Sequence, residues 1–178
     1  TRMVKSNLDL MIGRAIRVDR GGPEARMGKL LAVKDDHIVI YIEDEGMLYY
    51  KIDHIKSISL DTKDFSDVVA QSNDADQTPP PQYIDVDDFV SVLQYMKYHW
   101  VQVNRGGPEK VEGVLVEADP DQVTLISNNE IIQILPFHIR NISYGLKKKD
   151  NENKKNSDNK EENKQNDKQE QNNDDKKE

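Results

Sequence analysis

The pentapeptide RGGPE stands at residues 20–24, within "IRVDRGGPEARMGKLLAV", and again at residues 105–109, within "VQVNRGGPEKVEGVLVEA". Aligning the two strings brings further identities into register. After a one-residue deletion, "HIKSIS" at 54–59 matches "HIRNIS" at 138–143. About 15 of roughly 51 aligned positions are identical, which indicates an internal repeat. The chain therefore contains two copies of one structural unit.

Turn residues divide each repeat into short runs rich in β-branched side chains, a pattern that predicts five strands per repeat. We expect strands at 15–20, 25–34, 37–43, 47–52 and 57–60 in the first repeat, and at 100–105, 110–118, 122–127, 131–137 and 141–145 in the second. The stretch "DDFVSVLQYMKYHW" (87–100) predicts a helix behind an Asp cap, with apolar residues at helical spacing: Phe89, Leu93, Met96 and Trp100.

The sequence thus predicts a mainly β fold of two tandem, small, five-stranded SH3-like or Sm-like barrels, each preceded by a short helix. We assign the first repeat to residues 1–60, an acidic Pro-containing linker to 61–84, and the second repeat to 85–146. Residues 147–178 contain only Lys, Asp, Glu, Asn, Gln and one Ser, so they cannot bury apolar surface and are expected to form a disordered tail. A unit of about 55 residues buries only ~60% of its unfolded surface. We therefore expect the repeats to pack together or to oligomerise.

The RGGPE strings have two interpretations. Two glycines that allow positive φ and a proline with fixed φ suit a hairpin connection between strands. The alternative is an anion-binding nest of backbone N–H groups beside Arg20 or Arg105, although Glu24 or Glu109 would repel the anion. We favour the structural interpretation for the whole motif: Arg20, Gly21, Gly22, Pro23 and Glu24, then Arg105, Gly106, Gly107, Pro108 and Glu109. Gly28 and Gly113, four residues after each motif, are expected at a bulge or bend.

No constellation of residues predicts catalysis. His54 and His138 occupy equivalent positions before the last strand of each repeat, where we expect them to cap a turn. The chain has four histidines, but only one in each repeat recurs at an equivalent position, which does not supply the converging ligands of a metal site; the chain also has no cysteine. The acids of "DVDD" at 85–88 precede the predicted helix, where they cap it and complement its dipole. We therefore expect no enzyme activity, no cofactor and no metal.

Nucleic-acid binding is the alternative function, because Sm-like barrels often bind RNA. Phosphate binding requires clustered Lys and Arg. Residues 1–146, however, carry 15 Lys and Arg against 23 acids, and thus the whole net charge of −8. The sequence therefore argues against nucleic acid, with a local patch at Arg14, Arg17 and Arg20 left open. No run approaches the ~20 apolar residues of a membrane span, and the first residues lack the features of a secretory signal.

The quoted residues also carry a resemblance. "VDRGGPEARMGKLLAVKDDHIVI" (18–40), "VNRGGPEKVEGVLVEADPDQVTL" (103–125) and "LPFHIRNISYG" (135–145) resemble the Bacillus spore coat protein B (CotB) family. The resemblance implies a structural protein of the outer spore coat, made in the mother-cell cytoplasm without a signal peptide. It also implies other coat proteins as partners, with a homo-oligomer expected through strand edges. Because the chain lacks cysteine, durable cross-links would need Lys–Gln or tyrosine chemistry, for which Tyr49 and Tyr50 are candidates.

Overall fold

The computed structural model describes residues 7–61, 63 and 81–145. The predicted tail at 147–178 and most of the predicted linker lie outside the described residues. We refer to residues 7–61 as the first half and to residues 81–145 as the second half.

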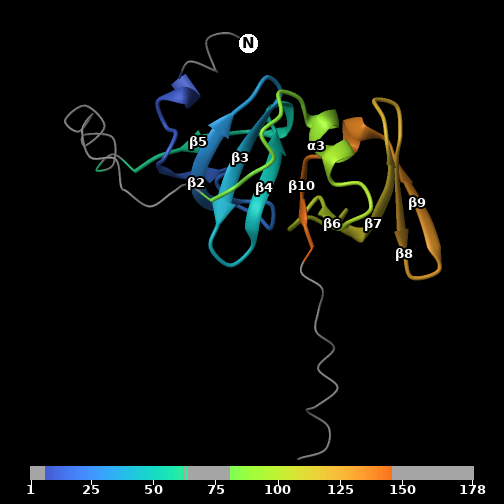
Figure 1. Ribbon diagram of the computed structural model, residues 1–178. Helices are drawn as coiled ribbons and strands as arrows, with labels where there is room; N and C mark the ends of the chain where they lie inside the picture. The colour runs from blue at the N-terminus through green and yellow to red at the C-terminus, as the bar shows by residue number, and fades with distance from the viewer. Residues whose placement is uncertain (1–6, 62, 64–80, 146–178) are drawn as a thin grey trace, which may run out of the picture. The chain divides into compact units, whose positions relative to one another are not determined.

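All ten predicted strands are present, five in each half (Figure 1). The first half contains β1 (Ala15–Val18), β2 (Arg26–Val33), β3 (His37–Ile42), β4 (Gly46–Lys51) and β5 (Ile58–Ser59). The second half contains β6 (Trp100–Val103), β7 (Val111–Ala118), β8 (Val123–Ser127), β9 (Glu130–Ile134) and β10 (Asn141–Tyr144). A 3₁₀ turn follows the fourth strand of each half: η1 (Ile52–His54) and η2 (Pro136–His138).

These strands form one ten-stranded sheet in the order β5-β1-β2-β3-β4-β10-β6-β7-β8-β9, and every pairing is antiparallel. Strand β10, drawn in orange, lies between β4 and β6 and joins the two halves (Figure 1). The mainly β prediction is confirmed, whereas two separate closed barrels are not. Among the described strands, β4 does not pair with β5, and β9 does not pair with β10. Instead β4 pairs with β10, whose other edge pairs with β6.

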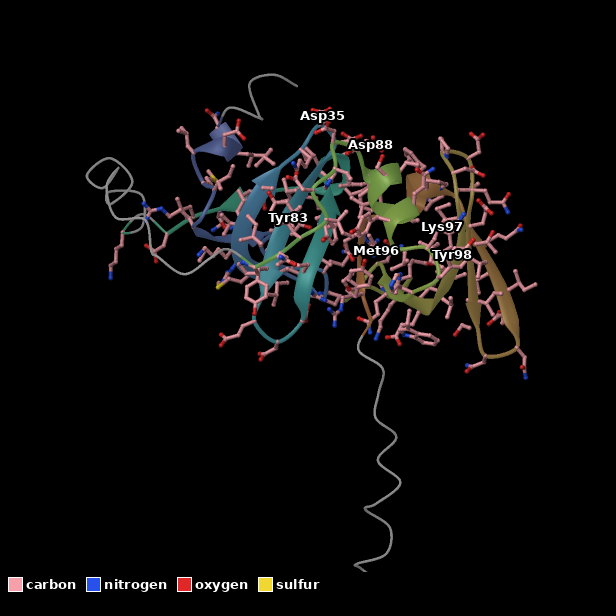
Figure 2. All side chains as sticks on the ribbon, in the orientation of Figure 1. Asp35, Tyr83, Asp88, Met96, Lys97 and Tyr98 are labelled. Atoms are coloured by element: carbon pink, nitrogen blue, oxygen red, sulfur yellow. The ribbon has the colours of Figure 1, made fainter. Side chains whose placement is uncertain are left out.

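The predicted helix is α3 (Phe89–Tyr95), which is shorter than expected. Its cap is Asp88, whose side chain accepts a hydrogen bond from the Ser91 N–H at 2.8 Å. Tyr98, labelled with Asp88 in Figure 2, has φ of 69° and ends the helical region before β6 begins. In the first half, residues 7–9 are helical.

Gly28 and Gly113 permit a close approach of neighbouring strands. A Cβ on Gly113 would lie 2.6 Å from the carbonyl oxygen of Ile126, and one on Gly28 would lie 2.6 Å from that of Tyr41. The bulges expected at these glycines lie beyond them instead. The register of β2 with β3 shifts between Leu30 and Ala32, and that of β7 with β8 shifts between Leu115 and Glu117.

Two apolar clusters stabilise the sheet, and one of them crosses between the halves. The first is built within the first half from side chains such as Leu30, Ile38 and Leu48. The second contains the core of the second half together with Ala32, Val39 and Tyr49 from the first. Successive residues of a strand point to opposite faces of the sheet. Ile38 and Val39 in β3 are both 0% exposed, and Tyr49 and Tyr50 in β4 are 1% and 0% exposed, so both strands are buried on both faces.

The segment that precedes α3 covers the outer face of β3 and β4. Tyr83, labelled in Figure 2, lies over the first half and packs against the shared cluster, as Phe89 does from α3. The hydroxyl of Tyr49 accepts a hydrogen bond from the Ile84 N–H at 2.8 Å. This contact satisfies a backbone donor of the second half with a side chain of the first.

Tyr49 and Tyr50 are 1% and 0% exposed, so they are core residues and are not accessible for cross-linking. Burial raises the pKa of both phenols to about 12. Their hydroxyls differ: that of Tyr50 has no hydrogen-bond partner among the described residues, whereas that of Tyr49 holds Ile84.

The close approach at Gly113 predicts that Gly113→Ala lowers the free energy of unfolding by more than ~1 kcal/mol, because the new Cβ would force β7 away from β8. Urea unfolding followed by circular dichroism measures this change. Gly21→Ala is the matched control, since nothing lies within 4 Å of its Cβ position and its φ is not positive. Equal stability of the two variants would contradict the close-approach explanation.

The two buried tyrosines give a second matched pair. Tyr49→Phe should cost roughly 1–3 kcal/mol, because it leaves the buried Ile84 N–H without an acceptor. Tyr50→Phe should be close to neutral, because it removes a hydroxyl that has no partner among the described residues. Thermal and urea unfolding of both variants would measure the difference, and a larger loss for Tyr50→Phe would refute the assignment.

Candidate functional site: the seam between the halves

The two halves meet along a seam formed by β4, β10 and the two RGGPE loops. In the sheet, Tyr50 pairs with Asn141 and Tyr49 with Ile142. One residue further on, the Lys51 N–H donates to the Arg140 carbonyl at 2.8 Å. The Lys51 ammonium donates to the Pro136 carbonyl, and burial lowers the pKa of this ammonium. The first half is therefore bound to the second through both backbone and side chain.

Each RGGPE string connects two antiparallel strands, β1 to β2 and β6 to β7, as predicted for a hairpin connection. The glycine with a left-handed backbone stands at a different position in each motif. It is the second glycine in the first loop, Gly22 with φ of +82°, and the first glycine in the second loop, Gly106 with φ of +84°. The two loops also touch. A Cβ on Gly106 would lie 2.1 Å from both the Pro23 carbonyl oxygen and a guanidinium nitrogen of Arg26. The absence of a side chain at Gly106 therefore lets the loops of the two halves pack together.

Ion pairs across the seam accompany this contact. Arg140 Nη2 lies 3.0 Å from Glu24 Oε1. Arg105 Nη1 lies 3.6 Å from Glu45 Oε2 and donates to the Glu45 carbonyl at 3.2 Å. Within the first half, Arg26 Nε lies 3.4 Å from the same Glu45 oxygen. All five side chains are partly buried, so the seam uses the glutamate of the first motif and the arginine of the second.

The residues before the two motifs were not singled out from the sequence, yet they hold the last strand of each half. Asp19 and Asn104 are 6% and 4% exposed and have φ of 57° and 55°. The Asp19 carboxylate accepts from the Lys56 N–H at 2.8 Å. The Asn104 side-chain oxygen accepts from the Arg140 N–H at 2.7 Å. Asp and Asn tolerate the left-handed conformation better than most residues, which is the signal that the sequence offered.

The two histidines end η1 and η2, and their contacts reach beyond the local turn. His54 Nε2 lies 2.8 Å from the Phe137 carbonyl oxygen of the other half, with the two rings 5.9 Å apart. The His138 carbonyl accepts from the Asn104 side-chain amide at 3.0 Å. His54 therefore belongs to the seam, which the prediction of a local cap did not include.

Most of the remaining motif residues are exposed. Arg20, Gly21 and Pro23 are exposed in the first loop, and Pro108 and Glu109 are exposed in the second. Gly107 lies at the seam, where a Cβ would meet the guanidinium of Arg140. Among residues 7–61, 63 and 81–145, no group of three or more His, Asp or Glu could hold a metal ion, and no helix is long and apolar enough to cross a membrane.

The contact at Gly106 predicts a difference between two glycines with the same backbone conformation. Gly22→Ala should cost roughly 1 kcal/mol, since φ is positive but the surrounding space is open. Gly106→Ala should cost clearly more, because the same strain is joined by the clash with Pro23 and Arg26. Chemical unfolding of both variants tests this expectation. Equal losses would show that the loops do not pack as described.

Comparison with known proteins identifies a relative. Over 148 residues, or 81% of its length, the chain is 34% identical to spore coat protein B of Bacillus subtilis (strain 168). The match spans 37% of that protein, so this chain corresponds to a part of the longer relative. No protein-family model and no solved structure matches the chain. Over the matched region, the chain belongs to the spore coat protein B family.

Proposed function

We propose that this chain is a non-enzymatic structural component of the bacterial outer spore coat. The observation that carries the proposal is the 34% identity to spore coat protein B over 81% of the chain. In this proposal the chain is made in the mother-cell cytoplasm. It assembles through strand edges with itself and with other coat proteins, and presents the charged residues 147–178 at the surface.

We further propose that each half is one SH3-like or Sm-like building block. The shared strand order supports this interpretation, since β5-β1-β2-β3-β4 in the first half corresponds to β10-β6-β7-β8-β9 in the second. The register shift in the second strand of each half also falls at equivalent positions, after Leu30 and after Leu115. The two blocks are joined by strand pairing, which is the kind of contact a coat protein can extend to its neighbours.

Nucleic-acid binding remains the alternative, but the seam gives it little support. Its three arginines face glutamates at 3.0–3.6 Å: Arg105 and Arg140 pair across the two halves, and Arg26 pairs within the first half. Arg17 and Arg20 of the first half are exposed. They belong to the local arginine patch that the sequence left open as a site for nucleic acid.

Fractionation of spores tests the proposed function. A tagged copy of the full chain, expressed from its own promoter in a spore-forming Bacillus, should be recovered in the coat extract and labelled at the spore surface by immunogold. Recovery only from the spore core or the mother-cell cytosol would contradict a coat role. Filter binding of the purified chain at low salt addresses the alternative, and salt-sensitive RNA capture would favour it.

A further inference from the structure

The two outermost strands of the sheet correspond to the two strands that pair at its centre. Among the described strands, β5 pairs only with β1 and β9 pairs only with β8. Strand β9 is the fourth strand of its half, as β4 is, and β5 is the fifth strand of its half, as β10 is. Among the described strands, the sheet therefore ends in a fourth strand at one edge and a fifth strand at the other. A fourth and a fifth strand are also the two that pair at its centre.

The correspondence holds residue by residue. Ile38 pairs with Tyr50, and Val123 pairs with Ile134. In each half, the 3₁₀ turn begins two residues after this position of the fourth strand. Tyr50 therefore corresponds to Ile134, and Tyr49 to Gln133.

The same holds on the other edge. The Asp19 N–H donates to the Ser57 carbonyl at 2.8 Å, just as the Asn104 N–H donates to the Asn141 carbonyl at 3.0 Å. Ser57 therefore corresponds to Asn141, and the next residue, Ile58, corresponds to Ile142.

We propose that copies of this chain join head to tail, with β9 of one copy pairing antiparallel with β5 of the next. The register repeats the central seam, so Ile134 lies opposite Ser57 and Gln133 lies opposite Ile58. This inference rests on the proposed function in so far as it names the partner edge used in coat assembly. Because the two edges differ, the contact is heterologous and leaves a free edge at each end for further copies.

Grooves lie at both edges where the docking would occur. Beside β9, a groove of about 660 Å³ is lined by residues that include Glu109, Gln133 and Leu135, and it extends to His54 and Arg140 at the seam. Beside β5, a groove of about 640 Å³ is lined by the first RGGPE loop with Lys56 and Ser57. At the central seam, the equivalent positions are occupied by the opposite half, as the close packing at Gly106 demonstrates.

The exposed side chains at the two edges are complementary. Next to β9, Leu135 and Phe137 are 59% and 74% exposed, which leaves apolar surface uncovered on that edge. The ion pair of the central seam, Glu24 with Arg140, has its counterparts in Glu109 near β9 and Lys56 near β5. Glu109 and Lys56 are both exposed in the single chain, and they carry opposite charges.

The contact between copies should be weaker than the central seam. At the seam, the outer face of the sheet at Val39 and Tyr49 is covered by the segment before α3. The counterparts in the second half are Thr124 and Gln133, which are polar and not fully buried. The copies therefore gain edge pairing and the loop contact without this apolar cover, which predicts reversible, concentration-dependent association.

Sedimentation velocity of the purified full chain over a concentration series tests the inference. The wild-type chain should form a ladder of head-to-tail species as concentration rises. Glu109→Lys and Lys56→Glu should each weaken association about tenfold, because like charges then face each other across the joint. An equimolar mixture of the two variants should regain wild-type association, since every joint between one variant and the other again places a lysine opposite a glutamate.

Matched controls separate this joint from general charge effects. Asp44→Lys, in the turn between β3 and β4, and Lys29→Glu, in β2, make the same charge changes at exposed positions on or between interior strands of the sheet, and should leave association unchanged. Gln133→Pro removes an edge N–H independently of charge, and should abolish the ladder while circular dichroism shows a folded chain.

A monomer at all concentrations would overturn the inference, as would association that survives both the charge reversals and Gln133→Pro. Weakening by the control variants to the same extent would also overturn it. A chain that stays monomeric in solution but is still recovered in the coat extract would refute head-to-tail pairing alone and leave the proposed coat role standing.

Discussion

The pairing of β4 with β10 is the interaction on which the rest of the structure depends. A fourth strand left unpaired would expose a row of backbone donors and acceptors at the edge of a small sheet. The last strand of the second half supplies partners for that row through Tyr49, Tyr50 and the Lys51 N–H. Once these strands are joined, the RGGPE loops are brought into contact and Glu24 and Arg140 come within 3.0 Å of each other.

The two halves share one strand order but are buried differently. The first half is covered on its outer face by the segment before α3, and Val39 and Tyr49 there are apolar and buried. The second half carries Thr124 and Gln133 at the counterpart positions, on a face that no described segment covers in this way. The different side chains on this face of the two halves are therefore explained by their different neighbours. An exposed face is stable with polar side chains, whereas a covered face favours apolar ones because burying an unpaired polar group costs free energy.

The strands, the hairpin at RGGPE and the Asp88 cap could be predicted from the sequence, because each depends on local turn chemistry and apolar periodicity. The seam could not, because strand pairing between distant segments leaves no local signal. One clue was nevertheless present: "HIVIYI" at 37–42 is an almost continuous apolar run, which is typical of a strand buried on both faces, whereas "QVTLIS" at 122–127 alternates. The apolar run "MLYY" at 47–50 gives a similar indication for the neighbouring strand, and would have placed Tyr49 and Tyr50 in the core and not among accessible cross-linking residues.

The central claim is that the seam makes the two halves, residues 7–61 and 81–145, one cooperative structure, and Trp100 offers a direct test of it. Trp100 is the only tryptophan and lies in β6 of the second half, whereas Ile38 is fully buried in the cluster of the first half. Ile38→Val should cost about 0.5–1.5 kcal/mol. If the halves unfold together, the urea midpoint reported by Trp100 fluorescence will fall by the same amount as the midpoint reported by circular dichroism. A Trp100 midpoint that stays at its wild-type value while circular dichroism shows an earlier, separate transition would contradict the account.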